Sequence, residues 1–174
     1  MTELSSQARG GLRELFAGTP ETIAGTVYGT IIVMATLVAG APAFKHDLWH
    51  LLAIVVVTTV VFWAAHIYAH GLGESLQLGR RVTRSELVHI AHRERAMALA
   101  VVLPALALVL GALGVIRGSV SIWLALGLGV AALAVQGLRY ARLERLSVTG
   151  SVVVVGLNLA LGLALVLLKV IVVH

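Results

Sequence analysis

The sequence predicts an all-α membrane protein: a bundle of five transmembrane helices with the N-terminus inside and the C-terminus outside. The 174 residues are 59% hydrophobic and only 12% charged, with a mean hydropathy of +0.99. A soluble domain carries about 25% charged residues. Five apolar stretches each have the length of roughly twenty residues that a membrane-spanning helix needs. The whole chain, residues 1–174, is therefore expected to form a single transmembrane domain.

The first segment, residues 1–18, is expected to lie on the inner leaflet as an amphipathic helix. Apolar residues recur in it at helical spacing among charged ones: Leu4, Ala8, Leu12, Leu15 and Phe16. A span then begins at "TPET", where Thr19 can cap the helix and Pro20 suits its first position. The expected spans cover residues 20–41, 48–70, 96–116, 120–138 and 148–171.

The basic residues set the expected orientation. Ten Lys and Arg residues precede span one or lie in the loops after spans two and four, whereas only Lys45, Arg117 and Lys169 lie on the other side. Cytoplasmic loops are enriched in Lys and Arg, so the ten mark the inside of a bacterial-type plasma membrane. The net charge of +5 then reflects topology and contact with anionic lipid, and no nucleic-acid partner is expected. The absence of cysteine excludes disulfides and thiolate metal sites.

Residues 71–95 are expected to form the cytoplasmic end of a helical hairpin. Span two should project past the membrane to about Glu74. In "TRSE", Thr83 and Glu86 have the spacing of a capping box, so a new helix should begin near Arg84. That helix is expected to run without a break through "SELVHIAHRERAM" into span three.

The hairpin carries the candidate metal site. In "FWAAHIYAHGLGE", His66, His70 and Glu74 lie four residues apart, on one helix face. Glu-x-x-His spacing in the returning helix aims a carboxylate and an imidazole at one ion. This ligand set suits a divalent transition metal such as iron, zinc or manganese. The full predicted set is His66, His70, Glu74, Glu86 and His89, with His92 as a further ligand or supporting group.

Two other interpretations of the histidines stay open. They can be boundary residues that sense pH or simply pack, in a membrane module without enzymatic activity. They can also belong to a histidine-box oxidoreductase, because His46 and His50 in "HDLWH" repeat the spacing of "HIYAH". The first pair is expected across the membrane from the others, about 30 Å away, so a shared metal centre is disfavoured and no enzyme is expected.

Span one carries a stripe of small and hydroxyl-bearing residues. Gly25 and Gly29 form a small-xxx-small pair, which lets two helices approach closely, and a homodimer through span one is expected. Thr26 and Thr30 on this stripe, with Asn158 in span five, are the candidates for lining a transport path.

Several segments resemble the vacuolar iron transporter family: "GTVYGTIIVMATLVAG" in span one, "LPALALVLGALGV" in span three and "GLNLALG" in span five. The resemblance implies five spans, an inside N-terminus and a cytoplasmic metal-binding region between spans two and three. Family members carry an acidic residue just before the second glycine of the first helix, where this chain has Tyr28, and the methionine of their second helix has no match here. The expected function is a small transporter or channel for a divalent transition metal, with protons as candidate counter-ions.

Overall fold

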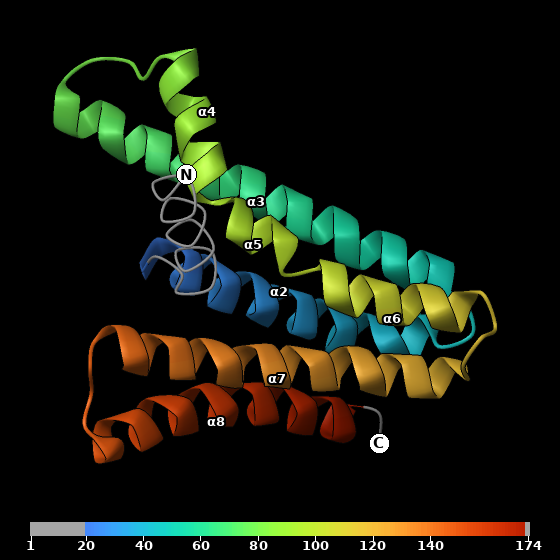
Figure 1. The fold of residues 1–174 in the computed structure, drawn as a ribbon. Helices are drawn as coiled ribbons and strands as arrows, with labels where there is room; N and C mark the ends of the chain where they lie inside the picture. The colour runs from blue at the N-terminus through green and yellow to red at the C-terminus, as the bar shows by residue number, and fades with distance from the viewer. Residues whose placement is uncertain (1–19, 173–174) are drawn as a thin grey trace, which may run out of the picture.

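The regular structure of the described residues, 20–172, is entirely helical in the computed structural model (Figure 1). The helices are α2 (Pro20–Phe44), α3 (Leu48–Leu78), α4 (Arg84–Arg93), α5 (Arg95–Leu99), α6 (Val102–Ala112), α7 (Gly118–Leu143) and α8 (Val148–Val172). The amphipathic helix expected in residues 1–18 lies outside the described residues.

Five segments are long and apolar enough to cross a membrane: Pro20–Phe44, Leu48–Leu78, Arg95–Ala112, Gly118–Leu143 and Val148–Leu168. This confirms the all-α class and the five apolar spans. The orientation across the membrane stays a prediction.

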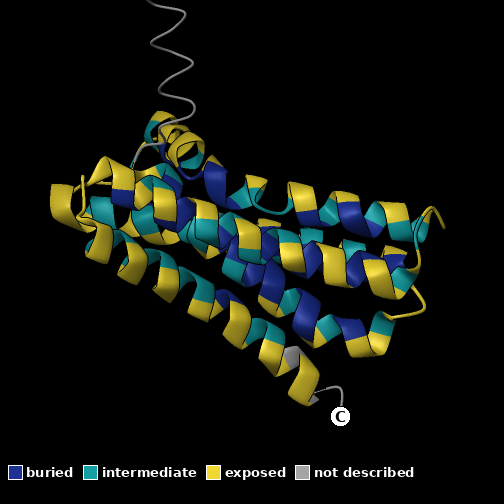
Figure 2. Ribbon diagram, turned by 60° about the horizontal axis from the view of Figure 1, so that its bottom comes forward, coloured by how far each residue is buried: buried dark blue, intermediate teal, exposed yellow. Residues whose placement is uncertain are grey.

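Helix α2 lies at the centre of the bundle and contacts α3, α5, α7 and α8. In the most apolar 18-residue stretch of α2, 50% of the residues are buried inside the protein. In the corresponding stretch of α8, which packs mainly on α7, the buried share is 6%. The core consists of large apolar side chains from four helices: Met34, Leu37, Leu51, Leu108 and Leu126 are all fully buried. Figure 2 shows buried residues on the facing sides of the long helices and exposed ones outside, where α8 presents its apolar surface. In a membrane that outer surface faces lipid.

The predicted unbroken helix from Arg84 into span three is wrong, because the chain bends twice. The regular helix is interrupted at Glu94, between α4 and α5, and again at Ala100 and Val101, between α5 and α6. Pro104 explains the second bend: it has no N–H to donate to the carbonyl of Ala100, four residues earlier, and its ring crowds that carbonyl. The first bend has no Gly or Pro nearby, and packing against α2 accounts for it, as shown below.

Other helix ends follow local rules. Thr83 and Glu86 form the expected capping box at the start of α4. Helix α6 stops at Ala112, four residues before the expected end, because Gly114 adopts a φ of +75° and closes a Schellman motif. In that motif the N–H of Val115 donates to the carbonyl of Leu110 over 3.0 Å.

The two ends of the bundle differ in charge. The end formed by the start of α2, the C-terminal part of α3, helix α4 and the α7–α8 turn is called here the arginine end. Its described basic residues are Arg80, Arg81, Arg84, Arg93, Arg95, Arg139, Arg142 and Arg145. The other end, formed by the turns at residues 45–47 and 113–117, is called the lysine end after Lys45 (Figure 1).

Candidate metal centre

Helix α3 places His66 and His70 on one face at the arginine end. Their rings meet edge to face, with centroids 4.5 Å apart and an interplanar angle of 61°. The ring of Tyr28 from α2 lies 5.6 Å from that of His66. Both histidines are half-buried, so each is held by neighbours and still reachable from outside.

The third member of the group is Glu94, at the bend between α4 and α5. Its Oε2 lies 3.4 Å from the Nε2 of His66, and the residue is only 6% exposed. The candidate ligand atoms of His66, His70 and Glu94 all lie within 4.8 Å of one another. The bend is what turns Glu94 toward α3.

Two glycines of α2 allow the bend. A Cβ atom added to Gly29 would overlap the carbonyl oxygen of Met97 in α5, and one added to Gly25 would lie 3.4 Å from the Met97 nitrogen and 3.9 Å from Glu94 Oε2. Helix α5 therefore packs directly on the glycine pair, and this contact fixes the position of Glu94, which immediately precedes α5. The face expected to mediate a homodimer is occupied by the chain's own helix, and the dimer stays a prediction without that face to support it.

A backbone contact selects the tautomer of His70. Its Nδ1 lies 3.2 Å from the carbonyl oxygen of His66. A carbonyl oxygen only accepts, so in the neutral ring this contact favours the tautomer with the proton on Nδ1 and a lone pair on Nε2 for a ligand. Metal-binding histidines are commonly oriented by such a second hydrogen bond.

Two imidazoles and one carboxylate match the preference of zinc, ferrous iron and manganese, and three ligands leave a coordination position open. In a tetrahedral zinc site with bonds of about 2.0–2.1 Å, neighbouring ligand atoms are about 3.3 Å apart. The contact between His66 and Glu94 already has nearly this length. Small side-chain movements would complete the group around an ion.

An open cavity of about 440 Å³ leads to the two histidines. Glu74, which lies one turn beyond His70, lines it, and so does Arg93. Arg93 Nε is 3.9 Å from the other carboxylate oxygen of Glu94. Glu74 therefore shares a cavity with the two histidines but is not among the three converging ligands found in residues 20–172, and its role as a ligand stays a prediction.

The predicted second wall of the site, Glu86 and His89, is corrected by the structure. The Glu86 carboxylate accepts hydrogen bonds from Arg80 at 2.6 and 3.2 Å and from the N–H of Thr83 at 2.7 Å. Arg80, followed by Thr83, lowers the pKa of Glu86 to about 2. Glu86 therefore caps α4. The carboxylate that converges with His66 and His70 is that of Glu94 and not, as predicted, that of Glu86.

His89 and His92 are exposed on α4, outside the group of converging ligands found among the described residues. His92 lines a separate cavity of about 340 Å³ together with Trp63 and Arg95. The predicted set contained Glu86 in place of Glu94 because it assumed a straight helix through Glu94.

The candidate path residues bond within their own helices. The hydroxyls of Thr26 and Thr30 donate to the carbonyls of Thr22 and Thr26 at 2.8 and 2.7 Å. The amide of Asn158 donates to the Val154 carbonyl at 3.0 Å, beside Gly137 of α7. Apolar core side chains lie between the two ends of the bundle.

The second histidine pair lies at the lysine end. His50 and His66 are sixteen residues apart on α3, which is about 24 Å of helix, so the two pairs do not share a metal centre. Comparisons of the chain with protein-family models, curated proteins and solved structures gave no match. The resemblance to vacuolar iron transporters stays an expectation.

Proposed function

We propose that this protein is a small membrane transporter for a divalent transition metal, captured at the arginine end by His66, His70 and Glu94. The convergence of these three ligands carries the proposal. They come from two separate parts of the chain, and the carboxylate is buried beside an imidazole. A buried carboxylate needs a positive partner, and a metal ion bound by both imidazoles would supply one.

Access to the site supports a cargo ion rather than a sealed structural one. The cavity in front of His66 and His70 is open, and Glu74 lines it. A divalent cation would meet a carboxylate at the mouth and a second one, Glu94, at the site. Three protein ligands leave one coordination position of the ion open, and the ion can be exchanged through it.

Transport would require a second conformation, because Met34, Leu37 and Leu51 fill the middle of the bundle. The two bends that flank α5 could act as hinges for such a change. Movement of α5 across Gly25 and Gly29 would carry Glu94 away from His66 and release the ion. Thr30 and Asn158 would then be the polar groups nearest to an opened route.

A second candidate is a module that does not transport, in which protonated His66 and Glu94 form an ion pair. The 3.4 Å contact between His66 and Glu94 and the packed apolar core favour this alternative. In it, the pair would fasten α3 to the α4–α5 bend.

Metal binding and metal flux separate the two. Calorimetric titration of the purified protein with zinc, manganese and anaerobic ferrous iron should detect one ion per chain. Glu94→Gln should weaken binding by roughly 10–100-fold or more. Glu86→Gln is the matched control, because that carboxylate is engaged by Arg80, and it should bind as wild type does.

Proteoliposomes containing a metal-sensitive dye then test flux. Uptake by wild type that is lost in Glu94→Gln would support the transporter. If the protein binds the metal without carrying it, the transport proposal fails and the site is regulatory or structural. If no metal binds, both the transporter and the metal site are ruled out, and the ion-pair module is the remaining candidate.

A further inference from the structure

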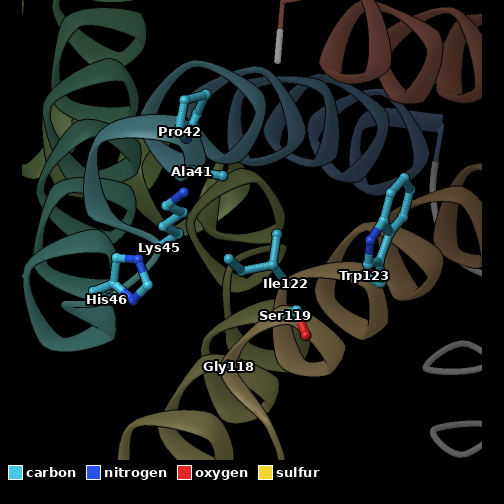
Figure 3. A pocket seen from close by; sticks show the side chains of 8 residues that line it. All are labelled: Ala41, Pro42, Lys45, His46, Gly118, Ser119, Ile122 and Trp123. Atoms are coloured by element: carbon cyan, nitrogen blue, oxygen red, sulfur yellow. The ribbon is translucent and has the colours of Figure 1, made fainter. Parts of the chain in front are cut away.

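A cavity at the lysine end belongs to no part of the metal site. It has a volume of about 410 Å³ and lies between the end of α2, the turn after it and the start of α7 (Figure 3). Its lining residues are Ala41, Pro42, Lys45, His46, Gly118, Ser119, Ile122 and Trp123.

The lining is divided by polarity along the bundle axis. Lys45, His46 and Ser119 lie in or beside the turns, at the outer part of the cavity (Figure 3). Ile122 and Trp123 follow on the first turns of α7, toward the membrane-spanning part of the bundle. A ligand that fits both parts has a polar, anionic head and an apolar chain.

Lys45 is a cation without a carboxylate partner within ion-pair distance among residues 20–172. Asp47 is the one acidic residue of the lysine end in that range, and it lines an adjoining cavity with Lys45. Its carboxylate is already engaged by His50: it accepts from the backbone N–H at 3.1 Å and from the ring Nδ1 at 2.7 Å. These contacts with His50 lower the pKa of Asp47, so this acid is ionised and committed to capping α3. The charge of Lys45 remains available to an external anion.

Tryptophans mark the depth of the cavity in the membrane. Trp123 borders it and Trp49 lies in the first turn of α3 at the same end, and they are 48% and 53% exposed. Trp is enriched where membrane proteins meet the headgroup layer. The polar part of the cavity therefore lies at the level of lipid phosphates, and its apolar part at the level of the first acyl carbons.

We propose that this cavity binds the headgroup phosphate of an anionic phospholipid, with one acyl chain lying along Ile122 and Trp123. Lys45 supplies the countercharge, and Ser119 and His46 supply hydrogen-bond donors to the phosphate oxygens. The first turn of α7 adds its own N–H groups at the rim, since Arg117 provides no side-chain cap there. The site is independent of the metal proposed at the arginine end.

Quenching of Trp123 by brominated lipid tests the site directly. Trp49→Phe combined with Trp63→Phe leaves Trp123 as the sole tryptophan. In mixed vesicles of phosphatidylcholine, brominated phosphatidylglycerol should quench Trp123 more strongly than brominated phosphatidylcholine at equal mole fraction. Adding Lys45→Ala should weaken the apparent affinity for phosphatidylglycerol by about fivefold, the loss of one basic residue at a charged surface.

Arg117→Ala is the matched control, because Arg117 is a basic residue of the same end that does not line the cavity. It should keep the preference for phosphatidylglycerol, and thermal unfolding should verify that both variants are folded. Equal quenching by both lipids, or an equal loss in both variants, would overturn the site. Relief of quenching by millimolar inorganic phosphate at constant ionic strength would identify free phosphate rather than lipid as the ligand, and would also overturn the proposal.

Discussion

The motifs "HDLWH" and "HIYAH" have the same spacing of histidines, but only in "HIYAH" do the two rings come into contact. His66 and His70 lie inside α3, so four residues make one turn and the rings meet. His46 precedes α3, which begins at Leu48, so it does not share a helix face with His50. The His50 ring instead stacks on Phe44, with centroids 5.9 Å apart.

The two motifs also differ in their acidic partner. Asp47 lies within its own motif and caps the helix that follows, in an exposed contact. Glu94 lies 28 residues after His66 in the sequence and is buried against it because α5 packs on α2. The comparison teaches that equal spacing produces a candidate site only where the helix continues and a distant element brings the third ligand.

The two ends should differ first in the side of the membrane that they face. Single cysteines placed at Ser75 and Ser147, at the arginine end, should be protected from impermeant thiol reagents in intact cells, while one at Ser119 should be labelled. The reason is the enrichment of basic residues at the arginine end. Labelling in the reverse pattern would put the metal group on the outside.

Removal of each histidine pair should then separate the motifs by metal affinity. His66→Ala with His70→Ala removes two of three ligands and should weaken zinc binding by at least roughly 100-fold, measured by calorimetry. His46→Ala with His50→Ala should leave the affinity unchanged. An equal loss in both double variants would mean that the metal is not held by the group at the arginine end.

Local sequence signals accounted for much of the fold. The apolar stretches predicted all five apolar spans, and Thr83 and Glu86 predicted the capping box that starts α4. The bend at Glu94 has no such signal, because no Gly or Pro accompanies it. It depends on contact with Gly25 and Gly29 about 70 residues earlier. The glycine pair was visible in the sequence, and only its partner was not.

For this reason the structure brings together only part of the predicted set. His66 and His70 converge with Glu94, while Glu74 lies outside that group. His66, His70 and Glu74 needed only the regular geometry of α3, and the structure places all three at one cavity. Choosing between Glu86 and Glu94 required the direction of α4. Arg80, six residues before Glu86, was the missed signal that this carboxylate would be engaged locally.

A methyl group on the glycine pair tests whether the bend builds the metal group. Gly29→Ala places Cβ against the backbone oxygen of Met97, so α2 and α5 must separate. The free energy of unfolding should fall by about 1–3 kcal/mol, and zinc affinity should fall with it because Glu94 moves. Thermal unfolding in detergent and zinc titration measure the two effects.

A glycine away from the contact with α5 serves as the control. At Gly127 of α7 the added Cβ would meet no atom within 4 Å. Gly127→Ala should therefore be neutral or stabilise its helix by up to about 1 kcal/mol. A Gly29→Ala protein that is as stable as Gly127→Ala and binds zinc normally would show that the bend has another cause.

The smallest expected effect distinguishes a capping carboxylate from a ligand. The pKa of Glu86, lowered by Arg80 and Thr83 from its ordinary 4.5 to about 2, makes ionised Glu86 a stabiliser of the start of α4. Because the folded-state pKa is the lower one, this contribution is complete above about pH 4.5 and is lost as the pH falls toward 2.

Hydrogen exchange of the first-turn amides of α4, corrected for intrinsic rates, should show protection that declines over that range in wild type. In Glu86→Gln it should be weaker and independent of pH, while Asp47→Asn, at the other end, should leave α4 unchanged. A decline of equal size in wild type and Glu86→Gln would show that another group governs the start of α4, and would free Glu86 for the ligand role that the sequence first suggested.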